Sequence, residues 1–316
     1  MSSLRTVIIV NPSSANGATG RRWPSIRETI DATLRQPFDV VFTEAPLHAT
    51  TLTRRYLQEG FEMIVALGGD GLINEVVNGF FEGGQNVFPQ AILGILSVGS
   101  GGDFIKTLGW DRDLSRGAQR LNGAKTRAVD VGKASYQDLQ GTRGTRYFLN
   151  IVDFGSGGAV VEKVNRTSKV LGGSLSFLWG ILSTLPTYRN KEIRFSVDDG
   201  EEKPAILNNL ILANGKYYGG GIKAAPDAAI DDGLFQVVAV GNVTFLEVLW
   251  NLPRFRKGTH ITHPKVESYV GRSLRATSEE QVFIDMDGEL VGTLPAAFEI
   301  LPKAIMLKVG DDDCPG

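Results

Sequence analysis

A four-residue turn, Gly68-Gly-Asp-Gly71, stands between two apolar patterns of different period. The run Met63–Leu67 before it is apolar throughout, which predicts a buried β-strand. After it, apolar residues recur at the spacing of one helix face: Ile73, Val76, Val77 and Phe80. A buried strand that turns through glycines into a helix is typical of a parallel α/β sheet. This stretch therefore constrains the fold of the chain more than any other.

The chemistry of this turn favours a phosphate ligand. Glycine lets the backbone turn sharply and lets a ligand approach it closely. The first N–H groups of the following helix point back at the turn and favour an anion. The carboxylate of Asp70 would lie beside the phosphates, where a magnesium ion or a ribose hydroxyl is commonly bound. The alternative is a turn with a structural role only, because a short motif alone is weak support for a site.

The same strand–loop–helix pattern runs through residues 1–130 and predicts an α/β nucleotide-binding domain with a parallel sheet. Ligands of such sheets bind beyond the carboxyl ends of the strands. Asn11, Thr43, the glycine turn and Ser100 are all expected at such ends, although Thr43 and Ser100 could instead only cap helices. The expected strands are Thr6–Val10, Asp39–Thr43, Met63–Leu67 and Ala91–Val98, and the expected helices are Trp23–Leu34 and His48–Tyr56.

After Asp130 the pattern changes to short strands separated by Gly, Asp and Pro turns, which predicts a β-rich antiparallel domain. We expect this domain to cover residues 131–309, with its last strand a candidate for return to the first domain, and residues 310–316 to form a disordered tail. The expected strands are Tyr147–Phe154, Ile193–Val197, Asn208–Ala213, Leu234–Val240, Gln281–Met286 and Phe298–Leu301. The expected helices are Ala159–Ser183, broken near Gly172-Gly173, and Phe245–Phe255.

Composition narrows the function classes. The chain has 316 residues, of which 42% are hydrophobic and 22% charged, as in ordinary soluble proteins. Its net charge is −2 and it has no Lys/Arg-rich tract, so we expect no nucleic-acid partner. Cys314 is the only cysteine, and Val7–Val10 is too short for a signal-peptide core. With no apolar run of about 18 residues, a cytoplasmic location is expected.

Six motifs carry a family resemblance. Neither a Walker P-loop nor a Rossmann fingerprint is present. Taken in order, the motifs resemble the catalytic domain family of diacylglycerol kinases and sphingosine kinases, and the chain looks most like its small soluble bacterial lipid kinases. The motifs are Asn11-Pro12 with its glycine loop, Gly68–Gly71 with Asn74-Glu75, Gly99–Phe104, Gly219–Pro226, Asp231–Leu234 and Asp287–Glu289.

The resemblance implies an ATP- and Mg²⁺-dependent lipid kinase with its active site in the cleft between the two domains. The acceptor would be a hydroxyl of a lipid such as diacylglycerol or a sphingoid base, and Glu289 would be the catalytic base. Asp232, with the carbonyl groups of Ala229 and Leu234, would hold a magnesium ion. The alternative for both the Glu289 motif and the Asp232 loop is a solvated hairpin turn without a catalytic or metal-binding role. ATP would contact Asn11, Thr43, Gly68, Gly69, Asp70, Gly71, Leu72, Ile73, Asn74 and Ser100.

Two positions depart from the family pattern. Leu72 stands where threonine is common in the family pattern, and a leucine there resembles the sphingosine kinase version. Gly102 stands where asparagine is usual. Two alternatives stay open. One is a kinase of a soluble substrate, because the fold resembles that of NAD kinases. The other, suggested by Leu72 and Gly102, is a catalytically silent protein that binds nucleotide or lipid.

The stretch Leu171–Leu185 predicts an unusually apolar helix that is either core or a wall facing lipid. Basic residues at both ends would suit peripheral contact with an anionic membrane surface. His260 and His263 show no metal-binding spacing and are expected in a surface loop, and a homodimer is kept open. The leucines of one helix face are Leu171, Leu175, Leu178, Leu182 and Leu185, and the flanking basic residues are Arg166, Lys169, Arg189 and Lys191.

Overall fold

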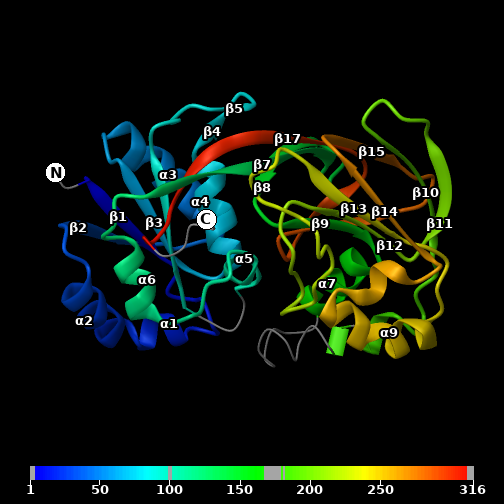
Figure 1. The fold of residues 1–316 in the computed structure, drawn as a ribbon, viewed down its shortest axis with the longest axis horizontal. Helices are drawn as coiled ribbons and strands as arrows, with labels where there is room; N and C mark the ends of the chain where they lie inside the picture. The colour runs from blue at the N-terminus through cyan, green and yellow to red at the C-terminus, as the bar shows by residue number, and fades with distance from the viewer. Residues whose placement is uncertain (1–3, 99–101, 167–178, 181, 312–316) are drawn as a thin grey trace. The chain divides into compact units, whose positions relative to one another are not determined.

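A computed structural model describes residues 4–98, 102–166, 179–180 and 182–311. The chain divides into two compact units. Figure 1 shows the whole chain, coloured by residue number. Unit 1 comprises the chain up to Ile105, Gly109–Val129 and the chain from Lys303 onward. Unit 2 comprises Lys106–Leu108 and Asp130–Pro302. Leu171, Leu175, Leu178, Ser100 and Cys314 lie outside the described residues.

Unit 1 is built on a parallel sheet, as predicted. The strands lie in the order β2 (Phe38–Phe42), β1 (Thr6–Val10), β3 (Met63–Gly68) and β6 (Ile92–Ser97). The last part of β17 (Glu289–Lys308) pairs with β6 in parallel. Each of β1 and β3 is buried along its whole length, which explains why both read as continuous apolar runs.

Helices cover this sheet because each presents an apolar face to it. Ile26 and Ile30, four residues apart in α2, pack against strand residues such as Val65 in one buried cluster. Helix α4 lies very close to α3, since a Cβ on Gly79 would be 2.4 Å from that of Thr53. The helices are α1 (Ala18–Arg21), α2 (Trp23–Thr33), α3 (His48–Gln58), α4 (Asp70–Gly79), α5 (Asp103–Thr107) and α6 (Leu114–Arg120), and β4 (Phe81–Glu82) pairs with β5 (Gln85–Asn86).

Unit 2 is antiparallel and β-rich, again as predicted. Strands β14, β13, β12, β9, β16 and β17 are neighbours in that order, and the other pairs are β10 with β11, β10 with β15, β15 with β17, β7 with β17 and β7 with β8. The strands are β7 (Thr126–Gln137), β8 (Arg143–Phe148), β9 (Ile151–Gly155), β10 (Lys191–Val197), β11 (Lys203–Leu207), β12 (Asn209–Ala213), β13 (Phe235–Val240), β14 (Val266–Gly271), β15 (Ser273–Thr277), β16 (Phe283–Met286) and the first part of β17.

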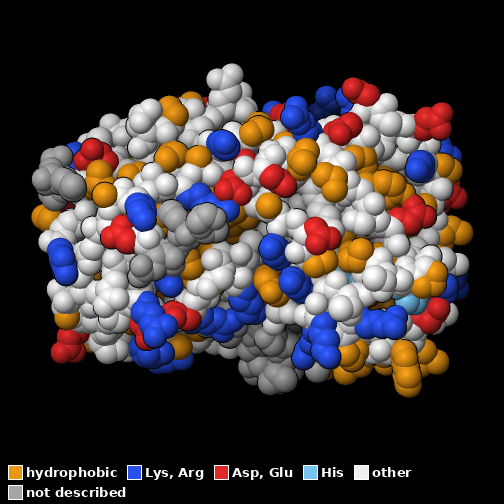
Figure 2. Space-filling model, in the orientation of Figure 1, with side chains coloured by type: hydrophobic (Ala, Val, Ile, Leu, Met, Phe, Trp, Pro, Cys, Tyr) orange, Lys and Arg blue, Asp and Glu red, His pale blue; other side chains and the backbone are white. Residues whose placement is uncertain are grey.

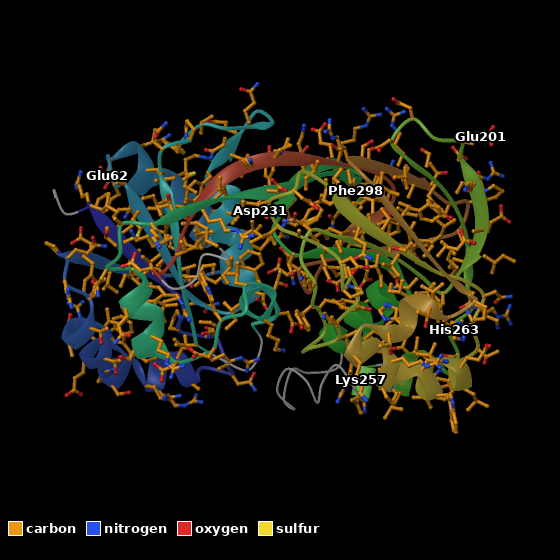
Figure 3. All side chains as sticks on the ribbon, viewed as in Figure 1. Glu62, Glu201, Asp231, Lys257, His263 and Phe298 are labelled. Carbon is orange, nitrogen blue, oxygen red and sulfur yellow. The ribbon has the colours of Figure 1, made fainter. Side chains whose placement is uncertain are left out.

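Aromatic rings fill the core of unit 2. Phe154 of β9 stacks on Phe298 of β17 with ring centroids 5.5 Å apart, and Phe298 is labelled among the strands in Figure 3. The expected strand Tyr147–Phe154 is in fact two strands, β8 and β9. The backbone N–H groups between them donate to the Asp287 carboxylate instead of to a sheet neighbour, so pairing is interrupted at Leu149 and Asn150.

The described part of unit 2 also contains the helices α7 (Ser156–Arg166) and α9 (Phe245–Lys257), the short 3₁₀ helix η2 (Thr259–Thr262) and helical residues at 179–180 and 182–184. Helix α9 begins with a capping box between Thr244 and Glu247 and ends at Gly258. Near α7, Leu185 is buried whereas Trp179 and Leu182 are 39% and 47% exposed. The described part of the stretch Leu171–Leu185 is therefore neither all core nor all surface. Within the described chain, no helix combines the length and the hydrophobicity needed to span a bilayer.

Candidate active site

The glycine turn, Gly68–Gly71, joins β3 to α4 in the predicted way. β3 ends at Gly68 and α4 begins at Asp70, with Gly69 extended between them. An added Cβ on Gly68 would lie 2.7 Å from Cδ2 and 3.1 Å from Cβ of Leu72, so a larger residue here would require the Leu72 side chain to move. Among the described residues other than its chain neighbours, no atom lies within 4 Å of the equivalent position on Gly69, so the described part of the chain leaves this side of the turn open. The backbone at Gly69 can therefore be approached by a ligand.

The carboxylate of Asp70 binds the backbone of the loop that follows β6. Its Oδ2 accepts hydrogen bonds from the N–H groups of Gly102 and Asp103, at 2.9 and 3.0 Å, and its Oδ1 accepts from Phe104 at 3.3 Å. Burial raises the pKa of the Asp70 carboxyl, and the hydrogen bonds from this loop oppose that rise. Asp70 thus caps the start of α5 and ties two strand-end loops together. A contact between Asp70 and ATP or magnesium stays a prediction.

Gly102 has a conformational reason for its identity. Its φ of +97° lies in a region that L-residues with side chains rarely adopt. A Cβ there would also lie 3.0 Å from Cγ1 of Ile105. What Gly102 contributes is its backbone N–H, which donates to Asp70. This conformation suits glycine at the position where the family pattern has asparagine.

The carboxyl ends of β2, β1, β3 and β6 come together at one edge of the sheet of unit 1. Thr43 N–H donates to the Val10 carbonyl at 2.9 Å, and Asn11 N–H donates to the Leu67 carbonyl at 3.3 Å. Val98 N–H donates to the Gly68 carbonyl at 3.1 Å. These bonds join neighbouring strand ends, so Asn11, Thr43 and the glycine turn share that edge. Ser100 follows the same edge in the chain but is not described.

Three predicted nucleotide contacts lie inside the unit. Leu72, Ile73 and Asn74 are 4%, 2% and 0% exposed. The Asn74 carboxamide oxygen accepts a hydrogen bond from Asn78 Nδ2 at 3.2 Å, one turn along α4. Their side chains are therefore packing and helix-stabilising groups. Of this segment, Gly69, Asp70 and Gly71 are partly exposed.

The expected magnesium loop, Ala229–Leu234, is held by a residue that the sequence did not single out. Oδ2 of Asp130 accepts from Gly233 N–H, and Asp130 N–H donates to the Ile230 carbonyl, both at 2.6 Å. Asp130 is fully buried. The only signal for it in the sequence is one aspartate inside the apolar run Val129–Val131.

Asp232 itself is exposed, and its Oδ1 accepts from Leu234 N–H at 3.0 Å. A carboxylate with nearby backbone carbonyls is chemically suited to Mg²⁺, which binds oxygen and retains several waters. In the described part of the chain, no three His, Cys, Asp or Glu side chains converge in a metal-binding cluster. A magnesium ion at this loop would therefore depend on one carboxylate, carbonyl groups and water.

Glu289 is the first residue of β17 and follows a tight two-residue turn. Asp287 and Gly288 have φ values of +50° and +87°, as a hairpin turn of this kind requires. Nη2 of Arg146 on β8 donates to Oε2 of Glu289. The side chain of Glu289 is 36% exposed and that of Arg146 is 14% exposed, so the carboxylate is oriented but accessible. No sequence pattern indicated Arg146, because only the fold brings it to Glu289.

Asp287, a second carboxylate two residues before Glu289, has a structural role. Its carboxylate accepts from the N–H groups of Leu149, Asn150 and Ile151, at 3.3, 3.2 and 3.0 Å. Its own N–H donates to the Ile151 carbonyl at 2.9 Å. Three donors on one carboxylate hold the start of β9 in place. This leaves Glu289 as the better candidate for chemistry.

Two further acids were missed. Asp153 of β9 and Asp285 of β16 are paired directly across the sheet and are 1% and 5% exposed. Within the described residues, neither oxygen of Asp153 has a hydrogen bond of normal geometry. Burial raises the pKa of Asp153 to about 7, while Asn209 and the Gly158 N–H lower it. Burial, followed by the charge of Asp153, raises the pKa of Asp285 well above its usual value.

An apolar pocket opens within unit 2 between α7, α9 and the sheet. It encloses about 760 Å³ of space that includes open solvent. Its wall is mainly aliphatic and aromatic, with a few amide and hydroxyl groups. Lining residues include Ser156 and Val160 of α7, Asn209 and Ile211 of β12, Val240 of β13, Val248, Leu252 and Phe255 of α9, and Leu185, Tyr218, Ile222 and His260.

The expectation that His260 lies in a surface loop is wrong. His260 is 0% exposed, and its ring stacks on Phe255 with centroids 4.0 Å apart. Its Nε2 lies 3.0 Å from the Ala224 carbonyl oxygen. Burial lowers the pKa of His260 to about 4, so the ring is neutral at pH 7. His260 therefore belongs to the wall of the apolar pocket, and His263, which is half-buried, also lines it.

Unit 1 offers a sheet edge at which a partly exposed glycine turn meets Asn11 and Thr43, and unit 2 offers an apolar pocket and an oriented carboxylate. Together they point to a phosphotransferase whose acceptor has an apolar part. Comparison with known proteins agrees with that class. Residues 5–134 match the diacylglycerol kinase catalytic domain, and residues 150–309 match the YegS C-terminal NAD kinase beta sandwich-like domain.

The chain is 30% identical over 307 residues to a diacylglycerol kinase of Staphylococcus carnosus, covering 95% of this chain and 94% of that protein. It is 28% identical over 309 residues to a diacylglycerol kinase of Bacillus subtilis, covering 95% of each. A solved diacylglycerol kinase structure from Bacillus anthracis shares the fold, with a TM-score of 0.70, 19% identity and coverage of 99% and 100%. The chain belongs to the diacylglycerol kinase family.

Proposed function

We propose that this protein is a lipid kinase that uses ATP and Mg²⁺ to phosphorylate a hydroxyl of a lipid such as diacylglycerol or a sphingoid base. The observation that supports it most is the apolar pocket of unit 2. A kinase of a dinucleotide or another water-soluble acceptor has no need of a wall made of Val248, Leu252 and Phe255. An acyl chain would fill it, because burying apolar surface is favourable.

Unit 1 would bind ATP at the shared edge of its sheet. The N–H groups at the glycine turn and the start of α4 would receive the phosphates, where a helix N-terminus favours negative charge. Asn11 and Thr43 offer an amide and a hydroxyl on neighbouring strand ends, and Ser100 offers a second hydroxyl on the chain that follows β6. Asp70 supports this role by holding the Gly102–Phe104 backbone against the turn.

Asp232, with the carbonyl groups of Ala229 and Leu234, would hold a structural magnesium ion. Such an ion supplies electrostatic cross-linking of oxygen ligands within one loop. The hydrogen bonds from Asp130 already fix the loop's backbone, so the ligands would be partly arranged in advance. A magnesium ion bound here would therefore stabilise unit 2 and would not take part in the transfer step.

Glu289 would act as the general base. The lipid hydroxyl oxygen would form a bond to the γ-phosphorus as the bond to the β-phosphate oxygen breaks and ADP leaves. The hydroxyl proton would pass to the Glu289 carboxylate, which Arg146 keeps in a fixed orientation. A lipid hydroxyl is a poor nucleophile, and a base that orients it and accepts its proton promotes the transfer.

The lipid acceptor implies peripheral contact with a membrane. Trp179 and Leu182 are exposed large apolar residues that follow α7 in the chain, and Leu185 lines the apolar pocket. Trp179→Glu should therefore weaken binding to anionic vesicles more than it weakens ATP binding. Circular dichroism and melting of the same variant would show whether the fold is kept.

The test is transfer of labelled γ-phosphate from ATP across a panel of acceptors, with magnesium and with a chelator. The panel would contain diacylglycerol, monoacylglycerol, a sphingoid base, ceramide, phosphatidylglycerol and NAD. We expect label in an organic-phase product, and none with the chelator. Label in NADP would instead establish a kinase of a soluble substrate. Lipid binding without any transfer would establish a catalytically silent protein.

A further inference from the structure

Helix α9 has two apolar faces that point in different directions. Val248, Leu252 and Phe255 line the apolar pocket. Leu246 and Trp250, one turn apart, are 72% and 87% exposed and do not line it. A helix that packs on one side normally has a polar opposite face. The second apolar face of α9 is therefore not explained by packing within unit 2.

The outer face of α9 consists of Leu246, Trp250, Pro253 and Lys257, which recur at helical spacing and are all exposed. Figure 2 shows hydrophobic side chains protruding beside Lys and Arg side chains at the lower right, where Figure 1 draws α9. Lys257 is labelled on this helix in Figure 3. A tryptophan that is 87% exposed beside a leucine that is 72% exposed is unusual unless a partner covers both.

The charges of α9 are one-sided. Arg254, Arg256 and Lys257 are exposed in its last turns. Its one acid, Glu247, is held in the capping box and pairs with Lys265 at 2.7 Å. The exposed charge of the helix is therefore positive and lies beside the exposed tryptophan. Tryptophan with lysine and arginine is the combination that suits the polar boundary of an anionic bilayer.

We propose that the outer face of α9 docks on an anionic membrane surface. Leu246 and Trp250 insert at the level of the lipid headgroups, and Arg254, Arg256 and Lys257 contact the anionic headgroups. We assign the partner as a bilayer because α9 carries the positive charges and the exposed tryptophan, and because the same helix lines a pocket suited to apolar chains. The inference rests on the proposed lipid kinase function and assigns the surface that brings the enzyme to its substrate.

Docking through α9 would bring the apolar pocket close to the membrane. The pocket-lining face and the outer face belong to the same helix, so docking of α9 on a bilayer would place the pocket one helix diameter from the bilayer surface. The segment with Leu185 and Tyr188 packs against Phe245 and Val248 at the start of α9. The start of α9 is therefore packed against the rest of unit 2. This packing holds the helix in place while its outer face contacts a bilayer.

The test is co-sedimentation of the full chain with vesicles of phosphatidylcholine, alone or mixed equally with phosphatidylglycerol. The double variant Leu246→Ser/Trp250→Ser should lower the partition coefficient on the mixed vesicles at least tenfold. The matched control is Ile206→Ser/Val270→Ser, which removes two apolar residues of 53% and 62% exposure from β11 and β14. This control should bind as the wild type does.

A second variant tests the charges. Arg256→Gln/Lys257→Gln should lower binding to the mixed vesicles by roughly fivefold for each charge removed. It should leave the weak binding to phosphatidylcholine unchanged, and added salt should reduce the difference from the wild type. Equal binding of wild type and both α9 variants to the mixed vesicles would overturn the proposal.

Two controls separate this inference from the proposed function. With a short-chain diacylglycerol dispersed in water, wild type and α9 variants should phosphorylate equally, because Leu246 and Trp250 are outside the pocket. No phosphorylation by the wild type would reject the kinase function instead. Light scattering without lipid checks the other occupant: a wild-type dimer that Leu246→Ser/Trp250→Ser converts to a monomer would assign the surface to a second copy and overturn membrane docking.

Discussion

Arg146 and Glu289 form an ion pair in unit 2 in which the arginine is the more buried partner, at 14% against 36% exposure. The guanidinium of Arg146, on β8, binds the Glu289 carboxylate, which remains partly exposed to solvent. A planar guanidinium also fixes the direction of the carboxylate it binds. A base that must meet a lipid hydroxyl needs this combination of fixed direction and access.

Asp70→Ala should lower turnover by roughly 10²-fold or more, on the scale of removing one preorganised group from an active site. The reason is that the Gly102–Phe104 backbone loses its acceptor, so the phosphate-binding edge loosens. The variant should stay folded by circular dichroism, with a free energy of unfolding lower by about 1–3 kcal/mol.

Asp70→Asn is the matched control, because its amide oxygen can still accept from part of the loop. We expect it to recover most of the stability but little of the turnover. Turnover close to wild type in Asp70→Ala would show that this carboxylate is dispensable for ATP use.

Asp232→Ala should remove the dependence of thermal stability on magnesium. The wild-type melting temperature should rise with added Mg²⁺, because a ligand that binds only the folded state stabilises it. Asp227→Ala, at another exposed acid of unit 2, should keep that rise. The same magnesium-dependent shift in Asp232→Ala and wild type would rule out Asp232 as a ligand.

Asp153→Asn should stabilise the protein in a pH-dependent way. The folded-state pKa of Asp153 is raised to about 7, whereas the unfolded value is about 3.9. The folded protein then binds more protons than the unfolded chain between these values, so stability falls as pH rises through this window. The full loss of stability from ionising buried Asp153 is present above pH 7 and absent well below pH 4. The asparagine variant cannot ionise and so avoids this loss.

We expect Asp153→Asn to raise the free energy of unfolding by on the order of 2 kcal/mol at pH 8 and by much less at pH 4.5. Urea unfolding at the two pH values measures this difference. Asp199→Asn, at an exposed position of unit 2, should show no such contrast. An equal effect of Asp153→Asn at both pH values would mean that its ionisation is not the cause.

Much of unit 1 could be predicted because its signals are local. β1 coincides with the expected strand Thr6–Val10, since a strand buried on both faces is an unbroken apolar run. The glycine turn was recognisable because strand, turn and helix follow one another directly. The capping of α5 by Asp70 could not be predicted, because Asp70 and Asp103, which this hydrogen bond joins, are 33 positions apart in the sequence.

The missed residues of unit 2 depend on long-range pairing. Asp153 and Asp285 face each other only because β16 pairs with β9 in this register. Arg146 reaches Glu289 across 143 residues of sequence. His260 is buried because η2 folds back beneath Phe255 and Ala224. None of these relations leaves a periodic pattern or a short motif in the sequence.

Glu289→Gln tests the central claim, that Glu289 is the base of a phosphoryl transfer to a lipid hydroxyl. The amide keeps the shape and the hydrogen-bonding reach of the carboxylate but cannot accept the proton. General bases contribute about 10²–10⁴-fold, so kcat with a competent lipid should fall by roughly that factor. The KM for ATP should change little, because the proposed nucleotide contacts belong to unit 1.

Asp287→Asn is the control, since Asp287 binds three backbone N–H groups of the β8–β9 connection. It should lower the melting temperature more than it lowers kcat. The decisive measurement is therefore kcat of the two variants side by side with the same lipid. We predict a large loss in Glu289→Gln and a small one in Asp287→Asn, and a fully active Glu289→Gln enzyme would contradict the account.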